Sequence, residues 1–363
     1  MPPTPPPRSL GSTPGTSPST MMDARIEHLF RSPAGGDLHP LHTQLRRYRA
    51  GTHTAATALS GPTSVASPVA PGADTVGPST AAHSIDRTAL QQRVRELPPL
   101  PQAAVQALAA LRNDSASAEH CGDLIARDQA LVARLLRLAN SAFYGVSGRV
   151  STVRDAVQLL GRRTVGSLLA VATVSQQFDR RRCPSFDFSG FWRHALAVAL
   201  ASRALALEVD VDEDQAFVGG LLHDIGRLTL AVHFPVQVDA LMQAAGAIDS
   251  PLNAMEFAHL GTDHAEVGAW VAAHWCFAPD VVAMIAAHHQ PPAGVDAAQT
   301  LATLVHVADA MVHALDLESD AHERVPVIAS HAWTRLRLTP EAVLGALAST
   351  ETGVIDLCEA MGL

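Results

Sequence analysis

The sequence predicts an all-α, multi-helix bundle preceded by a disordered N-terminal extension, and three observations support this. Hydrophobic residues make up 47% of the 363 residues and aromatic residues only 4%, and the abundant Ala and Leu favour helices over strands. From residue 86 onward, apolar residues recur at helical spacing, without a convincing alternating strand pattern. Residues 1–85 instead hold about half of the 24 prolines, with repeated Ser, Thr and Gly.

The composition of residues 1–85 predicts disorder, because so few apolar residues cannot offset the conformational entropy of the chain. We expect at most a transient helix near residues 22–31, and no packing of it against the rest of the protein. Because the segment before Met21 is of low complexity, Met1, Met21 and Met22 are all candidate translation start sites.

The region 86–180 is expected to form successive helices. Pro98, Pro99 and Pro101 interrupt one helix and open the next, and residues 114–117 form a turn and N-cap cluster before another. Asn140 and Gly145 end the helix LVARLLRLAN, and STVRDAVQLLG supplies the next one. The expected buried faces are Leu131, Leu135 and Leu138 in the first of these two helices, and Val153, Val157 and Leu160 in the second.

Charge and composition limit the function. The formal charge of −9 argues against nucleic-acid binding. The most apolar run, residues 195–207, is too short to span a membrane, and no signal peptide is evident, so we expect a cytoplasmic protein without a membrane segment. The four cysteines lie far apart and form no CxxC pair, which is typical of small hydrophobic residues in a reducing compartment.

The first candidate metal ligands are His194 and the pair His223-Asp224. His194 shares a helical face with Val198, Ala201 and Leu205, so it points inward; a core histidine bonded to a carbonyl is the alternative. Two glycines precede the His-Asp pair by one turn and allow a close approach, and apolar residues flank it. A buried carboxylate in such surroundings needs a partner, either a divalent cation or a neighbouring helix N-terminus.

Further candidates follow at intervals along the later helices. His264 lies in a first helical turn, where the helix dipole does not favour a histidine. His288 and His289 end the next helix, a place that also suits a merely structural imidazolium. Asp309 flanks the apolar stripe of the helix LATLVHVADAMVHAL, where a solvated boundary acid is the alternative, and the pattern places His306 and His313 on the solvent side. His120, His233, His259 and His274 are expected to be structural or surface residues.

The runs LLRLANSAFYG, DQAFVGGLLHDIGRL and LGTDHAEVGAWVAAHWCFAPDVVAMIAAHHQPP resemble the HDOD (HD-related output domain) family, a branch of the HD superfamily of metal-dependent phosphohydrolases. The resemblance implies an HD-type helical bundle at 86–315, with an N-terminal helical part at 86–180 and an HD-like part at 181–315. Residues 316–363 are expected to form a C-terminal helical cap. The HD superfamily pattern implies one or two divalent metals held by His194, His223, Asp224, His264, His288, His289 and Asp309. Mixed imidazole and carboxylate ligands suit Fe, Mn, Zn or Mg.

Two departures concern catalysis. Catalytic HD-GYP relatives carry Lys after the His-Asp pair, whereas this chain, in which all 26 basic residues are Arg, has Arg227. Their HHExxDGxGYP signature is replaced by HHQPPAGVD. Asp224 and Arg227 remain the candidate catalytic residues. The resemblance implies a bacterial signal-transduction output acting through protein partners, with a metal-dependent phosphohydrolase acting on a nucleotide or phosphodiester as the alternative, and a scaffold with an empty site as a third hypothesis.

Overall fold

A computed structural model of the chain describes residues 18–30, 39–56, 85–113, 115–145, 150–175, 178, 186–209, 211–245, 252–294, 296–317 and 324–362. These residues form helices and turns, and no strand occurs among them. Their buried apolar side chains make one continuous core. The predicted all-α fold is therefore confirmed.

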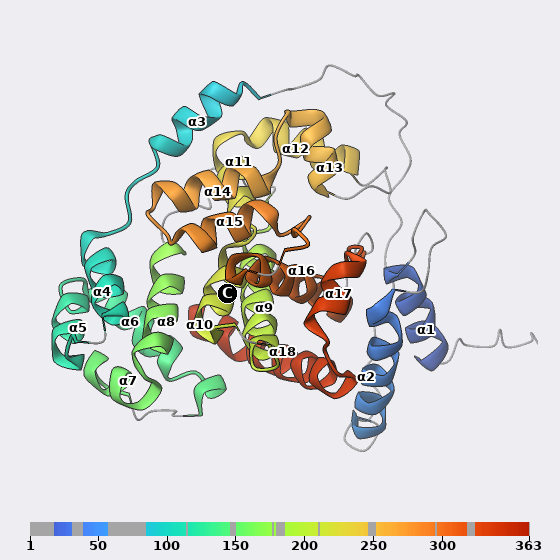
Figure 1. Ribbon diagram of the computed structural model, residues 1–363, viewed down its shortest axis with the longest axis horizontal. Coiled ribbons are helices and arrows are strands. Elements are labelled where there is room, and N and C mark those ends of the chain that lie inside the picture. The colour runs from blue at the N-terminus through green and yellow to red at the C-terminus, as the bar shows by residue number, and fades with distance from the viewer. Residues whose placement is uncertain are drawn as a thin grey trace, which may run out of the picture.

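The first helices after the extension form one end of the molecule, where α4 to α8 pack together (Figure 1). Leu131, Leu135 and Leu138 are buried as predicted, and α6 ends at the Asn140 cap. Gly145 adopts a positive φ of 65°, a conformation that glycine accepts without strain. The bounds are α3 (Arg87–Arg95), α4 (Gln102–Arg112), α5 (Ala118–Ile125), α6 (Gln129–Ala139), η1 (Ala142–Tyr144), α7 (Val153–Leu160) and α8 (Arg162–Val174).

The centre of the molecule is built around α9 (Phe188–Ala206), which contacts α10 (Glu213–Leu222), α16 (Ala297–Leu315) and α18 (Pro340–Met361). Gly220 permits the tight packing of α10 on α9, because a Cβ atom there would lie 2.6 Å from the carbonyl oxygen of Val198. The close approach predicted from the glycines before the His-Asp pair is therefore confirmed.

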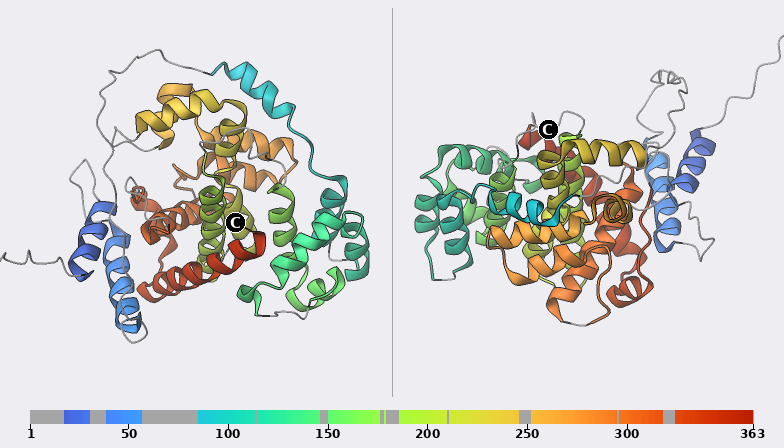
Figure 2. Two further views of the ribbon diagram at one scale, coloured as in Figure 1. Left: turned by 180° about the vertical axis from the view of Figure 1, so that it is seen from behind. Right: turned by 90° about the horizontal axis from the view of Figure 1, so that it is seen from above.

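A second group of helices covers one end of α9, α10 and α16 (Figures 1 and 2). Within it α14 packs against both α11 and α15, and α15 packs against α16. The chain turns sharply between α10 and α11, and His223 and Asp224 occupy that turn. The bounds are α11 (Ile225–His233), α12 (Pro235–Ala245), α13 (Leu252–Leu260), α14 (His264–His274), α15 (Pro279–Ala287) and α17 (Ser330–Leu336).

Part of the N-terminal extension is ordered and packed, contrary to the expectation of at most a transient helix near residues 22–31. Helices α1 (Pro18–Leu29) and α2 (Pro40–Ala56) lie beside α17 and α18 (Figures 1 and 2). Their few apolar side chains are concentrated on one face, with Ile26, Leu29, Leu41 and Leu45 all buried. The prediction is wrong because average composition does not register where such residues lie. The disorder predicted for the remainder of residues 1–85 concerns positions outside the described residues.

The solvent-facing side predicted for α16 is covered instead. His306 is buried and accepts a hydrogen bond from the backbone N–H of Ala329, and His313 is half-buried beside Asp309. The prediction is wrong for His306 because α17, α18 and the segment before α17 pack over α16, whereas His313 keeps 24% of its side chain exposed. A helix enclosed on all sides does not keep a polar solvent face.

Residues after 315 form α17 and α18, and α18 contributes Leu347 and Leu357 to the common core. The division of the bundle into an N-terminal part, an HD-like part and a C-terminal cap, with boundaries at residues 180 and 315, stays a prediction. Across the described residues, none of the helices combines the length and the apolar character needed to cross a membrane.

Candidate metal centre

The structure brings all seven predicted ligands together where α9, α10, α11, α14, α15 and α16 meet. Each residue is positioned by a helix or by the end of one. His194 lies on α9 and Asp309 on α16, His223 and Asp224 lie in the turn between α10 and α11, His264 is the first residue of α14, and His288 and His289 follow α15. Residues separated by more than 100 positions thus contribute to one polar cluster inside an apolar bundle.

One half of the cluster surrounds Asp309. Its Oδ1 atom lies 3.1 Å from His194 Nε2, 3.7 Å from His223 Nε2 and 3.3 Å from His313 Nε2. Three imidazoles, from α9, from the turn after α10 and from α16, therefore surround one carboxylate oxygen.

The other half surrounds Asp224. Its Oδ1 atom lies 3.0 Å from His264 Nε2, 3.6 Å from His223 Nε2 and 3.7 Å from His288 Nε2. His289 joins this half through its Nε2 atom, 2.7 Å from His264 Nε2. His223 lies between the two carboxylates, so the two halves are contiguous.

Backbone carbonyls fix the orientation of two of the rings. His223 Nδ1 donates to the Gly220 carbonyl at 2.6 Å, and His288 Nδ1 donates to the Ile285 carbonyl at 2.8 Å. Because a carbonyl can only accept, Nδ1 carries the proton and Nε2 presents its lone pair to the centre. This is the tautomer that a metal ligand requires.

Several inward-facing atoms have no hydrogen-bond partner among the described residues. They are buried, and they belong to three histidines and one aspartate: His194 Nε2, His223 Nε2, His288 Nε2 and Asp309 Oδ1. Burying so many unsatisfied polar atoms is costly. One or two divalent cations would satisfy them, because these residues belong to neighbouring groups whose donor atoms lie within 4.8 Å of one another. Imidazole with carboxylate is a donor set that Fe, Mn and Zn accept. The residues present therefore fit a metal, whose identity the structure does not specify.

The charge state of the cluster suits a cation. Burial alone would raise the pKa of Asp224, but His223, His264 and Arg227 together hold that pKa well below its ordinary value. Burial alone would also raise the pKa of Asp309, but the neighbouring His313 and His194 hold that pKa well below its ordinary value. Burial, followed by the nearby His223 and His264, lowers the pKa of His288 to about 3. At neutral pH the centre thus offers ionised carboxylates and a neutral His288, whereas Glu256 and Asp224 raise the pKa of His264 to about 10, so this ring must lose a proton before it can bind a metal.

Sequence reasoning missed three residues of the site. His313 follows Asp309 by one turn on α16, a spacing that could have identified it. Glu256 on α13 is buried and accepts from both the backbone N–H and the Nδ1 of His264, at 2.9 and 2.5 Å. His306 Nδ1 lies 2.7 Å from the His288 carbonyl oxygen. Nothing in the local sequence marks Glu256 or His306, because their partners come from other helices.

The predicted catalytic residue Arg227 lies at the rim of the centre. Its guanidinium donates to Asp224 Oδ2 at 3.0 Å, and a quarter of the side chain remains exposed. His194 and His313 are also partly exposed, at 16% and 24% of their side chains, whereas His288 is fully buried. Both halves of the centre therefore lie near the surface, at Arg227 and His289 on one side and at His194 and His313 on the other, while the donor atoms His194 Nε2 and Asp309 Oδ1 are themselves buried.

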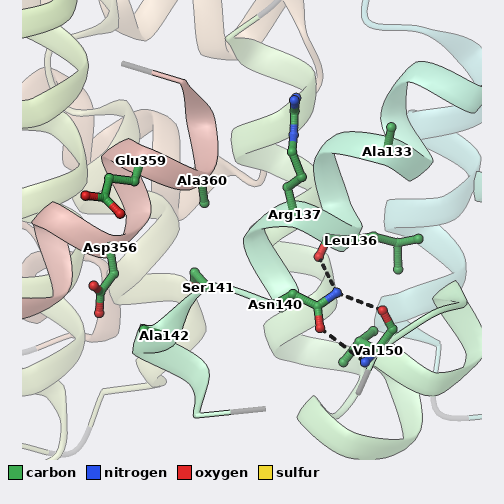
Figure 3. A pocket seen from close by; sticks show the side chains of 10 residues that line it. All are labelled: Ala133, Leu136, Arg137, Asn140, Ser141, Ala142, Val150, Asp356, Glu359 and Ala360. Carbon is green, nitrogen blue, oxygen red and sulfur yellow. Dashed lines mark hydrogen bonds between the residues drawn. The ribbon is translucent and has the colours of Figure 1, made fainter. Parts of the chain in front are cut away.

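A separate cavity of about 690 Å³ lies between α6 and the C-terminal turns of α18 (Figure 3). Asn140 holds its floor by bonding the carbonyl oxygens of Leu136 and Val150 and the N–H of Val150. None of the candidate metal ligands lines this cavity.

The fold and site define an HD-type helical module with a histidine and aspartate centre. The sequence profile of the HDOD domain matches residues 97–291, more than half of the chain. The protein belongs to the HDOD family. The predicted family membership is therefore confirmed.

Individual relatives agree with this assignment. An uncharacterized protein of Treponema pallidum (strain Nichols) is 26% identical over 243 residues, which are 65% of this chain and 46% of that protein, so the match spans about half of the relative. A crystal structure of a candidate phosphohydrolase from Shewanella amazonensis SB2B is 28% identical, with a TM-score of 0.63, and the match covers 77% of this chain and 100% of that one. An HDOD domain protein of unknown function from Geobacter sulfurreducens is 23% identical, with a TM-score of 0.57 over 76% of this chain and 94% of that one, and shares the fold.

Proposed function

We propose that the protein is a bacterial HDOD-type regulatory module that retains a divalent metal centre and acts through signalling protein partners. The observation that carries the metal part of the proposal is the group of buried, hydrogen-bond-free donor atoms around His223 and Asp309. Family membership supports the regulatory part. A metal bridging α9, α10 and α16 would hold these helices in one arrangement, and its loss would free them to adopt another.

The aspartates and the histidines would contribute differently to metal binding. Asp224 and Asp309 supply the negative charge, and His194, His223, His264, His288 and His289 supply neutral nitrogen donors, once His264 has lost its proton. When bound, a divalent metal lowers the pKa of a coordinated water and polarises phosphate oxygens. Arg227 lies where its exposed edge would attract an anionic ligand toward Asp224.

A second function, metal-dependent hydrolysis of a nucleotide or phosphodiester, is favoured by one specific observation. His194 and His313 beside Asp309 keep part of their side chains exposed, so this half of the centre lies near the surface from which a phosphate group would approach. The resemblance to the candidate phosphohydrolase of Shewanella amazonensis, over the whole of that chain, adds support.

Metal content by mass spectrometry tests the proposal. Wild type is compared with His223→Ala and with Asp309→Asn, which nearly preserves side-chain volume, and the exposed His120→Ala serves as a control for surface histidines. We expect about one or two equivalents of a transition metal in the wild type and in His120→Ala, and a clear loss in both centre variants. Circular dichroism verifies that each variant is folded.

Absence of metal from folded wild-type protein, even after incubation with Fe, Mn or Zn, would refute the metal-bound module. Turnover then separates the two functions. Metal-loaded protein that hydrolyses a chromogenic phosphodiester or a nucleotide, with loss of activity in Asp309→Asn, would establish the phosphohydrolase. Metal-loaded protein without turnover, which captures a protein partner only in the metal-bound state, would support the regulatory module.

A further inference from the structure

His313 is a histidine of the centre that lies outside the family pattern of ligands. It follows Asp309 by one turn of α16, so the two side chains share a face. Its Nε2 atom is 3.3 Å from Asp309 Oδ1, and its ring centroid is 4.8 Å from that of His194. We propose that His313 is an additional metal ligand, which forms an outer metal position together with His194 and Asp309. This inference rests on the proposed function, because it extends the same centre.

Two of the distances among these three residues match those required by a single ion, and the third is no longer than 4.8 Å. Two ligand atoms bound ~2.1 Å from one metal at tetrahedral or octahedral angles lie ~3.0–3.4 Å apart. Asp309 Oδ1 is 3.1 Å from His194 Nε2 and 3.3 Å from His313 Nε2. One donor atom from each residue lies within 4.8 Å of the others. A single ion can therefore contact all three side chains with small rotamer adjustments.

A plain ion pair between His313 and Asp309 is the simpler explanation, and the surroundings argue against it. In such a pair the carboxylate oxygen nearest the ring would accept a hydrogen bond from it. Asp309 Oδ1 is buried, has two imidazoles within 3.3 Å, and yet accepts no hydrogen bond from the described residues. Two rings directed at one unsatisfied oxygen are arranged as ligands around a shared cation.

The position of His313 also defines what the outer metal would bind. His313 and His194 keep part of their surface exposed, whereas in the Asp224 half only His289 does, and His264 and His288 are almost fully enclosed. Two imidazoles and one carboxylate leave coordination positions open. Because His194 and His313 lie at a partly exposed edge, a metal held there would take an external oxygen ligand, of which a phosphate group is the class that the proposed function implies. The nitrogen-rich donor set favours Mn, Fe, Co or Zn over Mg.

The experiment measures Zn and Co binding to His313→Ala, His313→Gln and His120→Ala by competition with a chromogenic chelator. Both His313 variants should lose one equivalent, or bind it ~100-fold more weakly, since even residues that only orient ligands contribute ~10–100-fold. The absorption bands of the cobalt-loaded protein should shift in the His313 variants and not in His120→Ala. Free imidazole should restore the lost equivalent to His313→Ala, and inorganic phosphate should perturb the cobalt bands of the wild type and His120→Ala but not those of the His313 variants.

Each contrary outcome has a distinct meaning. If both His313 variants keep wild-type affinity and cobalt bands while His194→Ala loses metal, His313 is not a ligand, and the proposed metal centre stands. If imidazole does not rescue a loss of metal in folded His313→Ala, the residue acts only on the surrounding structure, and the proposal is overturned. If the wild type binds no metal at all, both the proposed function and this inference fail.

Discussion

At the scale of single residues, Glu256 orients His264. The carboxylate is buried and bonds both the backbone N–H and Nδ1 of His264, so the ring's Nε2 is directed at Asp224. A carboxylate behind a ligating histidine fixes the ring and strengthens its donor atom. Burial alone would lower the pKa of His264, but Glu256 and Asp224 raise it to about 10. Metal binding at Nε2 therefore has to displace a proton, and it should weaken as the pH falls.

Glu256→Gln tests this role. The amide keeps the size of the side chain but removes its charge, so we expect metal affinity to fall ~10–100-fold with the fold preserved. Glu266→Gln is the matched control. Glu266 lies two residues after His264 on α14, but its carboxylate contacts Thr262 and Arg87 instead of His264. Titration with Zn against a competing chelator gives the affinities. Equal affinities in the two variants would show that Glu256 does not support the centre.

A second residue-scale prediction concerns the only two tyrosines, Tyr48 and Tyr144. Burial raises the pKa of Tyr144 to about 12, and burial together with Glu351 raises that of Tyr48 as well. Since the folded-state pKa lies above the unfolded value of ~10, the stability gained from a neutral phenol is complete below pH ~10 and is lost as the pH rises toward 12.

Ultraviolet absorbance of tyrosinate during an alkaline titration checks the tyrosine prediction. The folded protein should show little tyrosinate at pH 10, where about half of the tyrosine in urea-unfolded protein is ionised. Tyr144→Phe should unfold at a higher pH than the wild type. Ionisation of both tyrosines near pH 10 in the folded protein would contradict their burial.

At the scale of elements, the contact between α11 and α14 positions the centre. Asp224 directly precedes α11, and His264 begins α14. The two helices pack closely at Gly226, where a Cβ atom would lie 2.0 Å from the His264 carbonyl oxygen and 2.7 Å from the Gly268 nitrogen. Any side chain at this position would push Asp224 and His264 apart.

Gly226→Ala should therefore destabilise the protein by about 3 kcal/mol and also weaken metal binding. Gly345→Ala is the matched control, because Gly345 lies on an exposed side of α18 with no atom within 4 Å of the added Cβ. That variant should gain about 0.5–1 kcal/mol from helix propensity. Urea unfolding gives both values, and a Gly226→Ala protein of wild-type stability would show that the helices are not so tightly packed.

At the scale of the whole molecule, α1 and α2 join the N-terminal extension to the C-terminal helices. Arg25 pairs with Asp316 at 2.7 Å, Arg49 pairs with Glu351 at 2.7 Å, and the N–H of Val325 donates to the Leu29 carbonyl. α2 contacts both α16 and α18, and α16 carries Asp309. The helical pair lies outside the region matched to the HDOD profile.

Leu41→Ala tests whether the pair is docked. Leu41 is 1% exposed, so its truncation should lower the free energy of unfolding by ~2–5 kcal/mol. Met21→Ala removes an apolar side chain of α1 that is 63% exposed, and it should change stability by less than ~0.5 kcal/mol. If both variants unfold at the same denaturant concentration as the wild type, the pair does not contribute to the cooperative core.

The helical fold was predictable because apolar periodicity and end signals act locally. Leu131, Leu135 and Leu138 lie on one face of their helix however that helix packs. Ser117 and Asp128 cap their helices through local side-chain hydrogen bonds, which form as soon as the first turns do. The seven candidate ligands were identifiable through the resemblance to the HD superfamily, whereas their residue types and spacing alone left a structural alternative at each position. Average composition was a poorer guide, since it missed the packed face of α1 and α2.

The sequence by itself therefore determined the helices, most of their ends, the family and the set of candidate ligands. Only the tertiary structure decided that His313 and Glu256 join the centre, that His306 is buried beside the His288 carbonyl, and that α1 and α2 pack on α18. The physical reason is that periodicity gives the face of a helix on which a residue lies, whereas the partner of that face depends on how distant helices pack. Contacts such as the one between Glu256 and His264 exist only once that packing is complete.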